Sequence, residues 1–168
     1  MRKLIAITAL AFTSAWALSA CNQDQKDTAE VQTAAEVVVM PTSATDKAAW
    51  KKYLVSVVTG NMQGMTSRTP YMYFVPGGED DVAVTDRGNQ LENVSNVVAR
   101  GVVPGNMMAF GGPDSAKTAD LILEAFKDVQ AGAFKGVIIL FIGAQTDADR
   151  VKQALVNSGA EFRFVEMK

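Results

Sequence analysis

Histidine is absent from this sequence, and cysteine occurs once, at Cys21. Without histidine the chain lacks the usual base of hydrolytic triads, the commonest zinc ligand and the proton shuttle that works near neutral pH. With a single cysteine no disulfide can form within the chain, so its stability must come from packing. These absences exclude thiol chemistry in the folded part and the commonest forms of triad and zinc catalysis.

Signals for nucleotide and nucleic-acid binding are also missing. The sequence contains neither a Gly-x-Gly-x-x-Gly nor a Gly-Lys-Ser/Thr motif. The segment 111–115 leads from a predicted strand into a predicted helix, whose free amides suit a phosphate, but Asp114 would repel that phosphate. We interpret this segment as a close-packed turn. The 16 basic residues do not outnumber the 18 acidic ones, which does not favour a nucleic-acid partner.

The first 20 residues have the three parts of an export signal. Arg2 and Lys3 precede an apolar run over residues 4–18, and the small residues Ser19 and Ala20 precede Cys21. The 17 residues from 4 to 20 are fewer than the about 20 of a spanning helix, and hydroxyl side chains interrupt them. This pattern predicts that residues 1–20 are a signal peptide that is removed.

The tetrapeptide Leu18-Ser19-Ala20-Cys21 resembles the lipobox of bacterial lipoproteins. The resemblance implies cleavage before Cys21 and acylation of its thiol and amine, for example with palmitate. Each buried methylene adds about 0.8 kcal/mol, so several acyl chains anchor a protein durably. Without Arg2 and Lys3, the remaining 148 residues carry 14 basic and 18 acidic side chains, a net charge of −4. By the sorting rule of enteric-type bacteria, Asn22 favours the periplasmic face of the outer membrane.

Residues 21–44 are predicted to be the lipidated N-terminus and a flexible tether. They are rich in Gln, Asp, Thr, Ala and Glu and show little helical periodicity. Residues 37–40, Val-Val-Val-Met, are an apolar exception. We expect them to pack locally on the domain, rather than to add as an edge strand or to meet a partner.

Residues 45–168 alternate between helical and strand patterns. Apolar residues at helical spacing predict helices around 50–58, 91–98, 119–129 and 151–158, the last beginning with a Thr146 and Asp149 capping box. Apolar runs predict strands at 71–75, 107–110, 137–142 and 162–167. The third run suits a central strand and the fourth alternates as an edge strand does.

This alternation predicts one α/β domain with a four-stranded, mainly parallel sheet and helices packed on it. Parallel neighbours need crossover connections, and the helices supply them. An α+β sandwich with helices on one face only is the alternative. The strand order stays open at this point.

The loops that follow the first three predicted strands carry acidic side chains. In open α/β sheets, ligands usually bind at the carboxyl ends of the strands, here the loops 76–89, 111–115 and 143–147. Arg87 is the only basic residue in these loops. The acidic residues are Glu79, Asp80, Asp81, Asp86, Asp114 and Asp147. We predict an acidic edge, and these six residues are the candidate partner-binding surface.

Three interpretations of this edge stay open. The acidic side chains suit a basic protein partner that is steered by charge. They also suit a hard cation such as Mg²⁺ or Ca²⁺, although the spacing matches no EF-hand loop. The third interpretation is an exposed, solvated turn at Gly77 and Gly78. We predict neither a metal site nor a cofactor.

Candidates for catalysis are few. Ser115 and Lys117 form the closest serine–lysine pair, but residues two apart on a helix point in different directions. Met62, Met65, Met107 and Met108 offer soft sulfur to Cu(I), although methionines are more commonly part of the core. We therefore predict no catalytic residues and no enzymatic activity.

The lipid anchor, the tether and the small acidic domain are similar in plan to lipoprotein immunity proteins. Those proteins neutralise antibacterial effectors of type IV secretion systems in bacteria such as xanthomonads. The resemblance implies stoichiometric binding of a secreted toxin in the periplasm, and it transfers no functional residue. The alternatives are an envelope assembly or secretion-system accessory lipoprotein, and a carboxylate- or serine-dependent enzyme acting on cell-wall material.

Overall fold

The computed structural model describes residues 38–168. The predicted signal peptide, Cys21 and the tether up to Val37 lie outside these residues. The elements in chain order are α1 (Lys47–Gly60), β1 (Tyr71–Phe74), α2 (Asp81–Arg100), β2 (Met107–Gly111), α3 (Ser115–Phe126), β3 (Ile138–Gly143), α4 (Gln145–Leu155), the 3-10 turn η1 (Val156–Ser158) and β4 (Glu161–Glu166). Within the described residues, no helix combines the length and the apolarity needed to cross a membrane.

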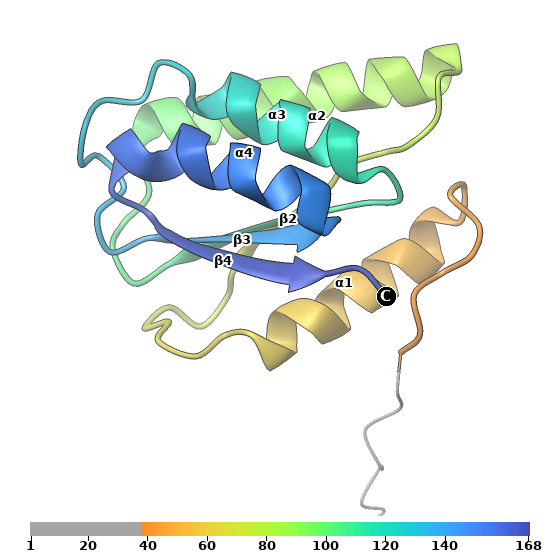
Figure 1. Ribbon diagram of the computed structural model, residues 1–168, viewed down its shortest axis with the longest axis horizontal. Coiled ribbons are helices and arrows are strands. Elements are labelled where there is room, and N and C mark those ends of the chain that lie inside the picture. Colours follow the sequence, from red (N-terminus) through yellow and green to blue (C-terminus); the bar gives the residue numbers. More distant parts are fainter. Residues whose placement is uncertain (1–37) are drawn as a thin grey trace, which may run out of the picture. The chain divides into compact units, whose positions relative to one another are not determined.

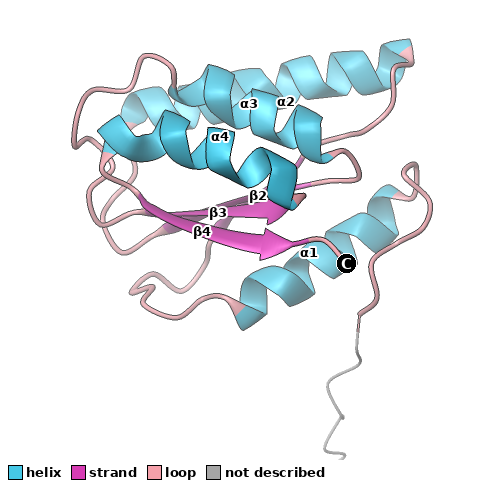
Figure 2. Ribbon diagram, viewed as in Figure 1, coloured by secondary structure: helices cyan, strands magenta, loops and turns pink. Residues whose placement is uncertain are grey.

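The four strands form one sheet in the order β1-β2-β3-β4, and every neighbouring pair is parallel. Helices α2, α3 and α4 cover one face of the sheet and α1 covers the other (Figures 1 and 2). Sequential strands joined by crossovers of one hand place all the connecting helices on one face. The predicted α/β domain with a parallel sheet is confirmed. The alternative, an α+β sandwich with helices on one face only, does not fit, because α1 covers the second face.

The two central strands are buried along their whole length. All residues of β2 and β3 are buried, as expected for apolar runs that are covered on both faces. Phe110, Ile139 and Phe141 belong to the core under α2, α3 and α4. Ala109 and Leu140 belong to the core under α1. This alternation confirms that β3 is a central strand. It also places Met107 and Met108, both fully buried, in the core.

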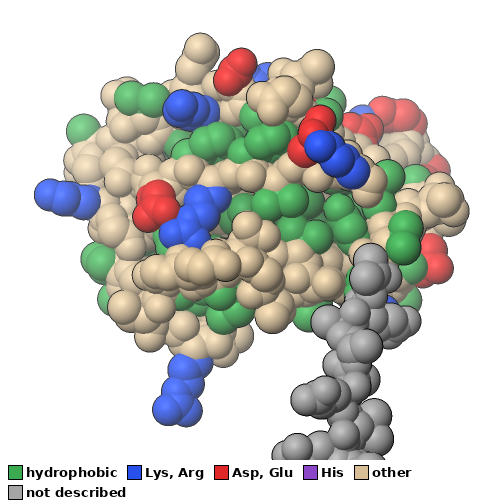
Figure 3. All heavy atoms as spheres, turned by 60° about the horizontal axis from the view of Figure 1, so that its bottom comes forward, with side chains coloured by type: hydrophobic (Ala, Val, Ile, Leu, Met, Phe, Trp, Pro, Cys, Tyr) green, Lys and Arg blue, Asp and Glu red, His purple; other side chains and the backbone are tan. Residues whose placement is uncertain are grey.

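The layer on the α1 side includes residues that were predicted to be tether. Val38 and Met40 pack against the α1 core, and the Trp50 Nε1–H donates to the Ser43 carbonyl at 3.0 Å. The predicted local packing is confirmed for these two residues, which lie before residue 45 and contact the core of the domain. Figure 3 shows this side, where hydrophobic side chains are visible between scattered charged ones.

The starts of two helices differ from the prediction. The segment 76–89 was expected to be a loop, but α2 already begins at Asp81. The first ten residues of α2 bury only Ala83, so they carry no apolar stripe. The capping box of α4 was also wrong: Ala144 is the N-cap residue, and no side chain of α4 bonds to it. The Ser115 hydroxyl of α3 accepts the Ala144 N–H at the start of α4 instead.

A close approach of two chain segments brings the loops of the carboxyl edge together. A Cβ atom on Gly112 would lie 2.0 Å from the Val75 carbonyl oxygen, so only glycine fits at this point. Val75 in turn donates its N–H to the Gly111 carbonyl at 2.9 Å. The ends of β1 and β2 are therefore locked side by side, directly before α2 and α3 begin.

Candidate functional site

The starts of α2, α3 and α4 meet at the carboxyl edge of the sheet, where all six predicted acidic residues lie. Asp80 is the N-cap of α2 and accepts the Ala83 N–H at 3.0 Å. Asp114 is the N-cap of α3 and accepts the Lys117 N–H at 3.1 Å. These two carboxylates satisfy free amides at positions where aspartate is favoured. Their first function is therefore to begin helices.

Two further carboxylates of the edge are held by lysines from other elements. Glu79 contacts the Lys117 ammonium, and Arg87 Nη2 lies 3.7 Å from its Oε2. The hydrogen bond from Lys117 lowers the pKa of Glu79 below its ordinary value. Asp86 lies within α2 and pairs with Lys47 of α1 at 2.5 Å. Glu79 and Asp86 thus belong to different ion pairs.

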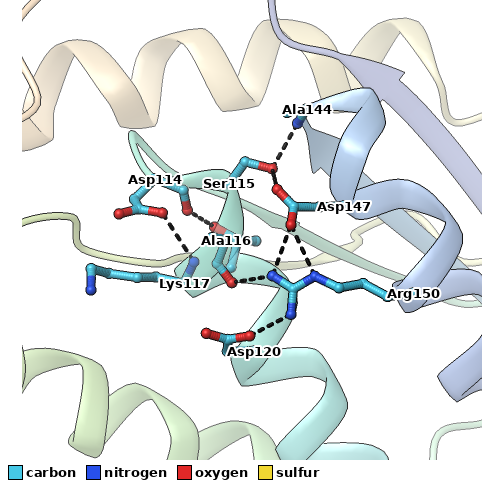
Figure 4. A network of polar contacts seen from close by, with 9 residues as sticks. Asp114, Ser115, Ala116, Lys117, Asp120, Ala144, Asp147 and Arg150 are labelled. Carbon is cyan, nitrogen blue, oxygen red and sulfur yellow. Dashed lines mark hydrogen bonds and ion pairs between the residues drawn. The ribbon is translucent and has the colours of Figure 1, made fainter.

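Asp147 lies at the centre of a polar network that joins α3 to α4 (Figure 4). The Ser115 hydroxyl donates to Asp147 Oδ2 at 2.6 Å and accepts the Ala144 N–H at 2.7 Å. Arg150 donates from Nε to Asp147 Oδ1 at 2.9 Å and from Nη2 to the Ala116 carbonyl at 2.9 Å.

A third contact of Arg150 extends the network to Asp120, also of α3. The hydrogen bond that Arg150 Nη1 donates to Asp120 is the largest cause of the raised pKa of the Arg150 guanidinium. In Figure 4 the guanidinium lies between α3 and α4, with both carboxylates directed toward it. The same network satisfies the start of α4, because the Ser115 hydroxyl accepts the Ala144 N–H. The predicted capping box of α4 does not form.

The fold corrects the expectation of an edge with a single cation. Lys47, Lys117 and Arg150 come from helices outside the predicted loops and join Arg87 there. Asp81 is exposed in the first turn of α2 and forms no ion pair within residues 38–168. The edge is a surface of mixed charge. Nothing in residue spacing alone reveals these cations, because they reach the edge only through helix packing.

The predicted catalytic and metal candidates at this edge do not come together. Lys117 contacts Glu79, whereas Ser115 contacts Asp147, so the two are not a serine–lysine pair. Over residues 38–168, no three acidic side chains approach closely enough to hold a metal ion.

A groove between α2 and α3 begins beside these ion pairs. A cavity of about 310 Å³ is lined by Arg87, Gly88, Leu121 and Lys117. A second cavity, of about 650 Å³, lies between the later turns of the two helices and reaches Phe134. Leu91 and Glu124 line both cavities, so the cavities adjoin each other, and we call the two together the α2–α3 groove.

The floor of the α2–α3 groove is apolar and its margins are charged. Leu121, Ala125 and Phe134 are buried core residues that also line it. Charged side chains of both signs stand around it: Arg87, Arg100, Lys117, Lys127, Asp120, Glu124 and Asp128. Sequence reasoning missed this groove because its two walls come from helices that only the fold places side by side.

Gly88 has an unusual position in this groove. It lies inside α2, where glycine is less stable than alanine by about 0.5–1 kcal/mol. A Cβ atom placed there would meet nothing within 4 Å. No neighbouring group of the domain requires glycine at this point, and its absent side chain widens the groove.

Comparisons with protein-family models, with curated proteins and with solved structures found no match to this chain.

Proposed function

We propose that this chain is a lipid-anchored periplasmic binding protein that neutralises an antibacterial effector by direct, stoichiometric binding. Two features support this proposal. The resemblance to a lipobox at Cys21 favours a position in the periplasm, which a toxin delivered by a neighbouring cell would reach. The α2–α3 groove offers a surface on the tethered domain for the toxin.

The groove carries the proposal because its dimensions suit a helix of a protein partner. From Gly88 to Gly101 the α2 wall runs for about 20 Å, at about 1.5 Å per residue. An amphipathic helix binds by laying its apolar face into a groove of this kind. The buried floor would receive that face, and the charged margins would contact its polar flanks.

The margins also supply specificity. Glu124 and Asp120 stand on the α3 side, opposite Arg87 and Arg100 on α2. The α3 side also carries Lys117 and Lys127, so it is mixed in charge, whereas the charges on the α2 side are basic. A helix with acidic residues along the flank that faces α2 would meet opposite charges there. Such complementarity speeds association and rejects wrong partners more than it adds affinity.

The contacts of Ser115 support a binding function over a hydrolytic one. Its hydroxyl donates to a carboxylate that Arg150 already holds, and it accepts a backbone N–H. A serine nucleophile needs a base that is free to take its proton. Here the hydroxyl joins two helices.

A binding experiment tests the proposal at Gly88. The full chain, purified from membranes in detergent, is titrated with a catalytically inactive form of any secreted toxin that a neighbouring gene is found to encode. Wild type is expected to form a one-to-one complex. Gly88→Gln fills the groove with a good helix former and is expected to weaken binding at least about tenfold, which corresponds to about 1.4 kcal/mol.

The matched control is Gly60→Gln. Gly60 ends α1 on the opposite face of the sheet, and a Cβ atom there also meets nothing within 4 Å. This variant should bind as wild type does. Absence of a complex with wild type would contradict the effector-binding function, whereas equal affinity of both glutamine variants would contradict only the groove. A strain that lacks the chain should also be inhibited by wild-type sister cells.

A further inference from the structure

The two edges of the sheet are protected differently. The edge strand β4 carries charged side chains at Glu161, Arg163 and Glu166, and Arg163 donates to the Asn61 carbonyl at 2.9 Å. The edge strand β1 reads Tyr-Met-Tyr-Phe and has no charge. Charged residues on an edge strand prevent pairing with another strand, so β4 is protected and β1 is not.

The free backbone groups of β1 follow from its pairing with β2. Val75 donates its N–H to Gly111, so the odd-numbered residues of this segment direct their backbone groups toward β2. Because these groups alternate along a strand, Met72 and Phe74 direct their N–H and C=O groups away from the sheet. Neither residue forms another backbone hydrogen bond within residues 38–168.

Proline residues limit this open edge on both sides. Pro70 and Pro76 have no N–H to donate, and each stands three residues from Tyr73. The segment 70–76 is therefore symmetric about Tyr73: two residues with free groups, Met72 and Phe74, lie between two prolines. A long foreign strand would meet a proline at each end.

We propose that two copies of this chain pair through β1 in antiparallel fashion, about a two-fold axis at Tyr73. Met72 then lies opposite Phe74 of the second copy, and Pro70 lies opposite Pro76 of the second copy. The two Met72–Phe74 pairs exchange four backbone hydrogen bonds, and the ladder ends where the prolines meet. The result is one continuous sheet of eight strands, made from two four-stranded sheets.

A second copy suits this edge better than an unrelated strand for two reasons. In an isologous interface only the residue on the two-fold axis meets its own copy, but every short segment around the axis faces the same segment of the partner. A charge on β1 would therefore lie near a like charge, and β1 has none. Apolar side chains are also exposed at the edge and on α1: Tyr71 at 42%, Met72 at 38% and Val55 at 51%. Met72 shares a small hollow with Leu54 and Val58 of α1, which the second copy would cover.

The register can be tested by disulfide trapping. Two differently tagged full-length copies are expressed together, one with Met72→Cys and one with Phe74→Cys, and their membranes are treated with a mild oxidant. Residues opposite each other in a hydrogen-bonded antiparallel pair have Cα atoms about 5.5 Å apart, within the range for a disulfide. We expect a product that carries both tags.

The matched control uses Val156→Cys in both copies, at a side chain that is 68% exposed outside the edge. Equal trapping of this control, or no trapping of 72 with 74, would overturn the proposal. Hydrogen exchange on the wild-type chain gives a readout that no substitution disturbs. The Met72 and Phe74 amides should become protected as concentration rises, whereas protection that is unchanged on dilution would place another segment on the edge and overturn the dimer.

Discussion

The Tyr73 hydroxyl is buried without a hydrogen-bond partner among the described residues. The ring stacks on Phe110 at 4.9 Å, and burial raises the pKa of the hydroxyl to about 12. A buried hydroxyl without a partner loses its hydration and gains nothing in return. The aromatic ring therefore accounts for the presence of this residue in the core, and its hydroxyl does not.

We expect Tyr73→Phe to raise the free energy of unfolding by about 1 kcal/mol, measured by urea denaturation at pH 7. The pH dependence gives a second check. The folded pKa is raised above the ordinary value of 10.0, so wild type loses stability as pH rises above 10 toward about 12. The phenylalanine variant should lack this loss. A less stable variant at pH 7 would show that the hydroxyl has a partner.

Ser115 gives the opposite expectation, because its hydroxyl is fully used. Ser115→Ala leaves the Ala144 N–H without its acceptor and Asp147 Oδ2 without the Ser115 donor, while Arg150 still donates to Asp147 Oδ1. We expect a loss of about 1–3 kcal/mol in the free energy of unfolding, measured by urea denaturation. Ser56→Ala, at an exposed position of α1, is the control and should stay within about 0.5 kcal/mol of wild type. Equal stability of the two variants would contradict the joining function of Ser115.

At the scale of the element, the start of α2 depends on a titrating group. The Ala83 N–H lowers the pKa of the Asp80 carboxyl, so its stabilising contribution is present above the unfolded pKa and is lost as pH falls through the lower folded value. Asp80→Asn keeps a capping side chain but cannot titrate. We expect wild type to be the more stable protein at pH 7 and the difference to shrink below pH about 4.

The measurement is the urea midpoint of both proteins between pH 2 and pH 7. Asp81→Asn is the matched control, because Asp81 lies in the same turn and its side chain makes no capping hydrogen bond within residues 38–168. A difference between wild type and Asp80→Asn that does not change with pH would contradict the capping explanation.

Elements with one dominant apolar pattern were predictable, and those without one were not. The run from Val137 to Ile142 could only be a covered strand, and β3 is fully buried. The first half of α2 was missed because it buries only Ala83. The loop positions of the six acidic residues could be read from the sequence, whereas the approach of Lys117 and Arg150 to them could not. Their position follows from the packing of α3 between α2 and α4, which no local spacing encodes.

The α2–α3 groove belongs to the same class of feature. Leu91 and Leu121 fit ordinary core positions in their own helices, and they line the groove only because the fold brings α2 and α3 together. Gly88 was the available signal, since a glycine inside a helix without a turn or a close contact calls for an explanation. The open edge of β1 could also be predicted in part from the sequence, because Pro70 and Pro76 stand on either side of an uncharged strand.

At the scale of the whole molecule, anchoring and binding are expected to be separable. Cys21 lies outside the described residues, and neither the α2–α3 groove nor β1 includes it. We expect Cys21→Ser, expressed with the cleavable signal peptide of a soluble periplasmic protein in place of residues 1–20, to move the chain from the membrane fraction to the soluble periplasmic fraction, because the lipid is then the only membrane contact proposed. The purified variant should bind the inactive toxin with the affinity of wild type.

Self-association of the variant should weaken, because the lipid anchor holds two copies at a high effective concentration on the membrane and the soluble chain is diluted. Fractionation, titration and disulfide trapping measure these three effects independently. A variant that stays in the membrane fraction would contradict the lipid anchor, and one that loses toxin affinity would show that the N-terminus takes part in recognition.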